Sequence, residues 1–248
     1  MSDPTPHRSI VGPEADSRIR LGGLFIQCGA SRTSTGGPRD AGRAPRLRVR
    51  WSDVRRLTPA DHRAMPWRNG GGTTTEIAIS PEGTGLAGAR FFYRVSIADV
   101  AVDGPFSRFG GYDRHIMLLA GAGMTLDCGA HGRIDLSERF VPRAFPGDWD
   151  VRGILVAGVV RDYNVIVDRS RASSTLDVHR LAAPQALACE PGTICIVHVI
   201  DGELAEAAAG DTLITEAPFD LVPRGAAHVA IARIVLRQPS VPGHGKPP

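Results

Sequence analysis

A chain of 248 residues with a formal net charge of +3 is long enough to bury a full core, as one large domain or two small ones. The positive charge lies at the start: residues 1–50 hold nine Arg against four Asp and Glu, whereas residues 51–248 hold 20 basic and 22 acidic side chains. The body of the chain therefore lacks the clustered positive charge that nucleic acid binding needs. No segment approaches the ~20 apolar residues of a membrane helix, so we expect neither nucleic acid nor membrane as a partner.

Four cysteines, at positions 28, 128, 189 and 195, show no C-x-x-C spacing. In a chain of this length such scattering is typical of reduced packing cysteines, and it favours a cytoplasmic protein over a disulfide scaffold. The apolar run 21–26 follows arginines as a signal peptide would, but it is short and interrupted by glycine. Export is the weaker alternative.

Residues 1–47 mix Arg, Gly, Pro and Ser without apolar periodicity, which predicts a disordered N-terminal extension, and residues 239–248 read as a C-terminal tail. Between them, Thr58 before Pro59 predicts a short capped helix. Almost everything that follows has strand character, with turns supplied by the many Gly and Pro residues. The predicted strands are 73–80, 91–99, 115–119, 124–128, 154–160, 162–168, 174–180, 194–200, 212–215 and 228–236. We therefore expect an all-β fold.

Two of these strands are predicted to have one core face and one more polar face, because side chains alternate along a strand. In "FFYRVSIAD" one face holds Phe91, Tyr93, Val95 and Ile97, and the other holds Phe92, Arg94, Ser96 and Ala98. In "RDYNVIV" Asn164 falls with Asp162 and Ile166, opposite Tyr163, Val165 and Val167.

The chain also repeats one pattern. "HIMLLAGAGMTL" is a strand, a glycine turn and a second strand, followed by Gly147-Asp148, and "CIVHVIDGEL" repeats that order before Gly210-Asp211. Two copies of one unit predict two similar β-halves packed together. We place the first half at residues 48–180 and the second at 181–238.

The phrases "MPWRNGGGTTTEIA", "FFYRVSIADVAVDGPFSRFGGYDRHIMLLAGAGMTL", "FPGD" and "VRDYNV" resemble, in this order, the HutD/Ves family of small bacterial cupin-type proteins. The resemblance runs from Trp67 to Arg169, with departures at Tyr93, where Trp is usual, and at residues 109–111, where Phe-Pro-Gly is usual. It implies a bicupin: two jelly-roll-like β-barrel halves packed in one chain, with few short helices. It also implies a modulator of histidine utilisation that binds a small acidic metabolite.

Catalytic patterns are scarce. Enzymatic cupins hold a metal with an H-x-H pair, a nearby Glu and a distant His, but the eight His residues form no such pair. We read His115, His131 and His198 as packing or surface residues. Gly-x-Ser-x-Gly is absent, and no base can be located beside Ser96. We therefore predict no catalytic residue, metal or cofactor, while a cupin isomerase or oxygenase with an atypical metal site stays open.

Arginines are better candidates, because a guanidinium group matches a carboxylate bidentately. Arg94 lies on a polar strand face and Arg114 precedes an apolar strand, although either could serve a structural ion pair. The loop "WRNGGG" from Trp67 is followed by neither a helix nor a lysine, so it does not predict a phosphate cradle. Its glycines let the backbone approach a neighbouring strand or a ligand closely. We expect this loop to form the rim of a pocket, with a structural turn as the alternative. Amide side chains such as that of Asn164 can both donate and accept hydrogen bonds.

The predicted ligand-binding residues are Trp67, Asn69, Gly71, Thr73, Glu76, Arg94, Ser96, Arg114 and Asn164. The leading hypothesis is a metal-independent protein that binds a small carboxylate-containing metabolite. The alternatives are the cupin enzyme above and a stress-related interaction protein with no small ligand. A homodimer is common among cupins, but no residue pattern here demands one.

Overall fold

The computed structural model describes residues 53–84 and 90–237, which lie in one compact unit. The expected N-terminal extension and C-terminal tail fall outside the described residues. Within that part of the chain, regular structure is almost entirely β, with two single-turn 3-10 helices, η2 (Pro59–Asp61) and η3 (Gly129–His131). None of its helices has the length and apolar character to cross a membrane.

The helix η2 confirms the predicted cap. The Asp61 carboxylate accepts hydrogen bonds from the backbone N and the Oγ1 of Thr58, each at 2.8 Å, and Pro59 occupies the first helical turn. Thr58 and Asp61 thus satisfy the exposed start of a very short helix.

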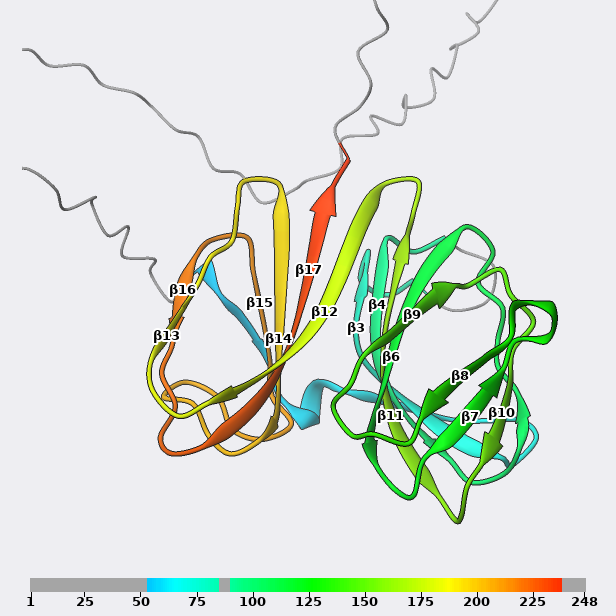
Figure 1. Ribbon diagram of the computed structural model, residues 1–248. Helices are drawn as coiled ribbons and strands as arrows, with labels where there is room; N and C mark the ends of the chain where they lie inside the picture. Colours follow the sequence, from blue (N-terminus) through cyan, green and yellow to red (C-terminus); the bar gives the residue numbers. More distant parts are fainter. Residues whose placement is uncertain (1–52, 85–89, 238–248) are drawn as a thin grey trace, which may run out of the picture. The chain divides into compact units, whose positions relative to one another are not determined.

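The first half of the fold consists of a six-stranded and a four-stranded antiparallel sheet (Figure 1). The six-stranded sheet has the order β2 (Arg63–Pro66), β3 (Gly72–Ser80), β4 (Tyr93–Val100), β11 (Val160–Asp168), β6 (Tyr112–Ala120) and β9 (Arg143–Pro146). The four-stranded sheet has the order β5 (Gly104–Pro105), β10 (Arg152–Leu155), β7 (Met124–Asp127) and β8 (Arg133–Leu136).

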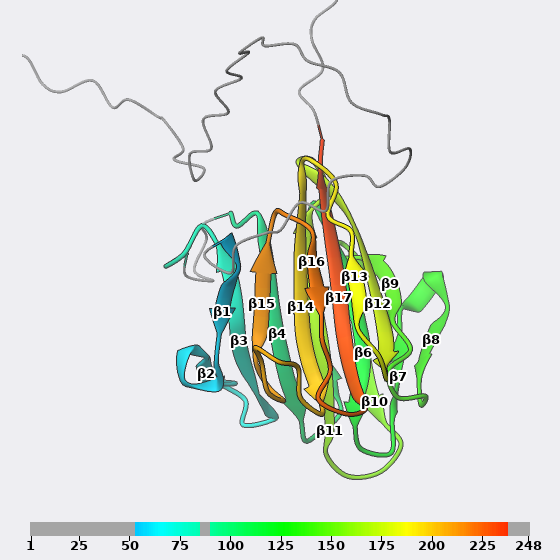
Figure 2. The same cartoon turned by 90° about the vertical axis from the view of Figure 1, so that its left-hand side faces the viewer.

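The second half has a five-stranded and a two-stranded sheet. The five-stranded sheet has the order β1 (Arg55–Leu57), β15 (Thr212–Thr215), β14 (Thr193–Asp201), β17 (Ala227–Leu236) and β12 (Ala172–Leu181), and the small sheet pairs β13 (Gln185–Leu187) with β16 (Phe219–Leu221). In Figure 2 the strand axes of the two large sheets are roughly parallel to each other, and one sheet lies behind the other.

Apolar side chains fill three layers. The central layer lies between the two large sheets and joins Val95 and Val165 of the first half to Ile196 and Ile234 of the second. A second layer lies inside the first half, where Ile116, Leu118, Met124 and Leu126 pack together, and a third lies inside the second half around Val197, Val199, Leu213 and Ile231. Each large sheet is therefore covered on both faces, as the predicted all-β bicupin requires.

The predicted alternation holds within the strands and fails just before β4. Tyr93 and Val95 belong to the central layer, whereas Arg94 and Ser96 face the interior of the first half. Phe92, however, also packs in the central layer, and Phe91 joins a separate cluster with Tyr112 and Ile166. The assignment of both phenylalanines to strand faces is wrong, because regular extended pairing starts only at Tyr93.

Sheet membership does not follow the expected boundary at residue 181. The strands β1 and β12 come before that boundary, yet Arg55 pairs with Ile214 of β15 and Leu176 pairs with Ala232 of β17. Both strands thus belong to the five-stranded sheet of the second half. The predicted strand 154–160 is also divided: β10 ends at Leu155, a turn follows, and β11 begins at Val160.

The internal repeat is visible in two glycines. Gly121 follows β6 and Gly202 follows β14, both have positive φ, and an added Cβ would meet the backbone of Val160 at the start of β11 or of Ala227 at the start of β17. The second copy is less regular, because the residues after Gly202 make isolated bridges instead of a counterpart to β7. The glycine at each turn is therefore the best-preserved part of the repeat.

We predict that Gly121→Ala lowers the free energy of unfolding by about 2–4 kcal/mol, because the new Cβ would lie 2.7 Å from the carbonyl oxygen of Val159 in a backbone with φ of +102°. Gly158→Ala is the control: φ is +61°, no atom lies within 4 Å, and only about 1 kcal/mol of backbone strain is expected. Urea denaturation measures both. Equal losses for the two variants would contradict the close approach.

Candidate ligand-binding site

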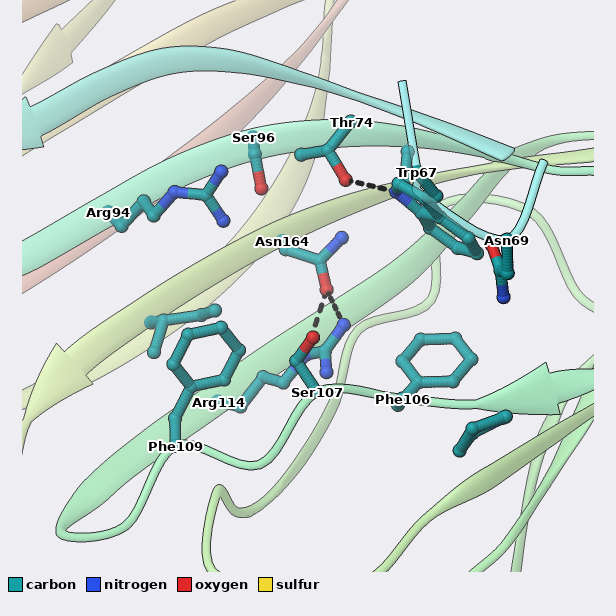
Figure 3. A pocket seen from close by; sticks show the side chains of 13 residues that line it. Trp67, Asn69, Thr74, Arg94, Ser96, Phe106, Ser107, Phe109, Arg114 and Asn164 are labelled. Atoms are coloured by element: carbon teal, nitrogen blue, oxygen red, sulfur yellow. Dashed lines mark hydrogen bonds between the residues drawn. The ribbon is translucent and has the colours of Figure 1, made fainter. Parts of the chain in front are cut away.

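The interior of the first half contains a cavity of about 220 Å³ (Figure 3). Its floor is the inner face of the six-stranded sheet, which contributes Thr74, Arg94, Ser96, Ala98, Arg114, Asn164 and Ile166. Its rim comes from two connections, with Trp67 and Asn69 from the loop after β2 and Pro105, Phe106, Ser107 and Phe109 from the segment between β4 and β6. Strand alternation explains the floor, because residues two apart on β4 and β11 point to the same side.

Arg94 brings a buried cation to the cavity. Its side chain is 5% exposed, and its Nε donates to Oε2 of Glu76 on the neighbouring strand at 2.8 Å. Its Nη2 is buried and has no hydrogen-bond partner among the described residues. A buried donor left without an acceptor costs about 1–3 kcal/mol. Arg94 therefore presents an unused donor where a ligand could supply the acceptor.

Arg114 brings a second buried cation, held by a neutral side chain. Its Nε and Nη2 donate to Oδ1 of Asn164 at 2.9 and 2.6 Å (Figure 3). Its guanidinium group also lies over the rings of Phe106 and Phe145, 4.8 and 5.5 Å from their centroids. Burial lowers the pKa of Arg114 to about 10, so the group is still protonated at neutral pH.

A carboxylate lies on the far side of Asn164. The Asn164 amide donates from Nδ2 to Oδ1 of Asp162, which is fully buried. The other oxygen, Oδ2, has no partner in the described part of the chain. Burial raises the pKa of Asp162 to about 6. Asp162, Asn164 and Arg114 thus form a hydrogen-bonded chain that ends at the cavity.

The glycine-rich loop is both a turn and a rim. The indole Nε1 of Trp67 donates to Oγ1 of Thr74 at 2.8 Å, and Oδ1 of Asn69 accepts from the backbone N of Gly71 at 3.0 Å. An added Cβ on Gly72 would clash with the carbonyl oxygen of Asp99 on β4. Glycine is therefore needed for close packing of the loop against β4, and that packing places Trp67 and Asn69 at the cavity.

The structure brings six of the nine predicted residues to the cavity: Trp67, Asn69, Arg94, Ser96, Arg114 and Asn164. The other three do not line it. Gly71 lies beside Val102 and Asn69, Thr73 pairs with Asp99, and Glu76 pairs with Arg94. Binding of a ligand by any of the nine stays a prediction.

Sequence reasoning missed the aromatic side of the cavity. Phe106, Ser107 and Phe109 lie in an irregular segment with no periodic pattern, so no local signal assigns their direction. Ala98 and Ile166 could have been found, since alternation places them on the faces of Arg94 and Asn164.

The side chains that line the cavity do not suit a metal ion, because they offer guanidinium, hydroxyl and amide groups instead of imidazole and carboxylate ligands. Among the described residues, no three His, Cys, Asp or Glu side chains gather as a metal site would need. His115 pairs with Ser174 Oγ at 3.0 Å, His198 pairs with Thr212 Oγ1 at 2.9 Å, and His131 stacks on Trp149. None of these three histidines lines the cavity.

Comparison with known proteins places this architecture in a family. The chain is 40% identical over 125 residues to an uncharacterised 21.2 kDa protein from the hutC 3′ region of Pseudomonas putida, and 37% identical over 122 residues to Protein Ves of Citrobacter koseri. These matches cover 50% and 48% of this chain and 64% and 61% of the relatives. The chain thus matches somewhat less than two thirds of the length of these curated relatives.

Solved structures show the same relationship. HutD from Pseudomonas fluorescens SBW25 superposes with a TM-score of 0.62 at 30% identity, over 75% of this chain and all of that one. At 8% identity, the Escherichia coli pirin YhhW shares the cupin-type fold alone, with a TM-score of 0.50 over 73% of this chain and 99% of the pirin. The family model for HutD matches residues 59–231, which include both halves of the fold. The chain belongs to the HutD family.

Proposed function

We propose that this protein binds a small carboxylate-containing metabolite in the cavity of its first half, without a metal ion, and thereby modulates histidine utilisation in the cytoplasm. The observation that carries the proposal is that Arg94 and Arg114 line the same cavity, while the buried Nη2 of Arg94 has no hydrogen-bond partner among the described residues. Among the described residues, no carboxylate side chain lines that cavity. An anionic ligand would supply the missing acceptor and offset the buried positive charge.

The remaining walls suggest the rest of the ligand. Trp67, Phe106 and Phe109 offer apolar surface, while Asn69 and Ser96 offer groups that both donate and accept. The volume of about 220 Å³ is below the roughly 300–1,000 Å³ of pockets for drug-sized ligands. A compact acid that carries an imidazole or formyl group would fit this combination of size and polarity.

Two relatives support the link to histidine utilisation. The Pseudomonas putida relative is encoded in the hutC 3′ region, and the relative of known structure from Pseudomonas fluorescens is HutD itself.

We predict that calorimetric titration with formate, N-formylglycine and imidazole-4-acetate detects binding of at least one of these acids. Arg114→Ala should weaken that binding by more than about 2 kcal/mol, roughly 30-fold, because a charged hydrogen bond to the ligand is lost. Arg224→Ala is the matched control, since its exposed guanidinium group pairs with Glu203 in the second half, away from the cavity. The absence of binding by all three acids would count against the proposal.

Elemental analysis separates this function from that of a cupin enzyme with an atypical metal site. We expect less than stoichiometric transition metal in protein purified without a chelator, because the cavity presents cations where a metal needs anionic or imidazole ligands. One tightly held metal ion per chain would contradict a metal-independent site and favour the enzyme.

A further inference from the structure

The carboxylate of Asp162 is a buried acidic group that the binding proposal leaves unused. It lies on the central strand β11, whose backbone at this position pairs with Ala98 of β4 and Leu118 of β6, and it is fully inaccessible to solvent. Asn164 satisfies one carboxylate oxygen, whereas Oδ2 is without a hydrogen-bond partner among the described residues. A buried carboxylate with one unsatisfied oxygen is costly when ionised, and protonation of that oxygen relieves the cost.

Asp162 also sets the direction of the Asn164 amide. A carboxylate accepts hydrogen bonds, so it draws Nδ2 of Asn164 toward itself and leaves Oδ1 facing Arg114. The reversed amide would place two oxygens together and direct its own donors at a guanidinium group. Asp162 therefore holds Asn164, and through it Arg114, in the arrangement seen at the cavity.

The groups around Asp162 have opposing effects on its pKa. Burial raises this pKa to about 6, the charge of Arg114 on β6 and the hydrogen bond from Asn164 lower it, and the carboxylate of Asp99 on β4 raises it. Asp99 is itself paired with Arg161, at 2.7 Å. Ionisation of Asp162 near neutral pH is thus favoured by the positive charge of Arg114 and by the hydrogen bond from Asn164.

From this juxtaposition we infer that Asp162 is a positioning residue that takes up a proton when an anion binds between Arg94 and Arg114. The inference rests on the proposed function. A bound anion offsets the charge of Arg114, so that the Asp162 carboxylate loses its main electrostatic support and accepts one proton from solvent to form the neutral acid. In that form Oδ1 still accepts from Asn164, and the amide keeps its direction.

The direction of the pH effect on affinity follows from the thermodynamic linkage between ligand binding and protonation of Asp162. The ligand binds more tightly to the protein with Asp162 protonated, so affinity rises as the pH falls through the pKa of this group. Each unit by which the anion raises the pKa of Asp162 corresponds to about a tenfold change in the dissociation constant across the titration.

Calorimetry with N-formylglycine tests the coupling, because the single carboxylate of this probe stays ionised from about pH 5.5 to 8.5. For the wild-type protein we expect the dissociation constant to rise at least about threefold over this range, with proton uptake near pH 7 seen in buffers of different protonation enthalpy. Asp162→Asn should bind with a pH-independent affinity close to the wild-type value at low pH, and without proton uptake.

Asp168→Asn is the matched control, since Asp168 is a buried carboxylate on the same strand that has partners, Arg90 and Ser170, and does not line the cavity. It should keep the wild-type pH profile. A flat wild-type profile with binding present would overturn the coupling and leave the proposed function intact. Failure of N-formylglycine to bind at every pH would instead count against the proposed function, and the coupling would fall with it.

Carbon-13 NMR of the aspartate carboxyl groups follows the protonation of Asp162 directly, first in the free protein and then with N-formylglycine bound. In the free protein we expect Asp162 to titrate with a midpoint near pH 6, and the probe should move that midpoint upward. A midpoint below about pH 5 in the free protein would overturn the inference, because the carboxylate would then be ionised throughout the binding range.

Discussion

The candidate site depends on the burial of two guanidinium groups inside one β-half. Removing a charged group from water is costly unless other groups replace the lost solvation. Arg94 is compensated by the carboxylate of Glu76, and Arg114 by an amide oxygen and two aromatic faces. The compensation is incomplete for Arg94, which lines the cavity and whose Nη2 is without a partner among the described residues. A fold that buries guanidinium groups in this way is suited to binding an anion.

The two halves use the same architecture differently. In the second half, the inward positions of β14 are Cys195, Val197 and Val199, and those of β17 include Val229 and Ile231. Apolar packing fills that interior and leaves a hollow of about 10 Å³, close to the smallest volume that holds one water molecule. The corresponding strand of the first half, β6, carries Arg114 on its inward face beside Ile116. The first half therefore contains the cavity, while the interior of the second half is filled by apolar packing.

Sequence reasoning recovered the parts of the site that follow a regular strand. Arg94, Ser96 and Asn164 lie on β4 and β11, where alternation separates the central layer from the cavity floor. It failed where the backbone is irregular, as for Phe91 and Phe92 ahead of β4, because direction there is set by tertiary packing. It also placed Asp162 on the correct face without revealing its burial. Burial of that carboxylate depends on neighbours more than 60 positions away in sequence, such as Ala98.

The central claim is that buried cations in the first half receive a carboxylate directly. A crystal structure of the native protein grown with formate or N-formylglycine tests it most directly. The account predicts a carboxylate oxygen within hydrogen-bonding distance of Arg94 Nη2, with Arg114 still held by Asn164. Guanidinium groups that face bulk solvent, or an acid bound elsewhere while the cavity holds only water, would contradict it.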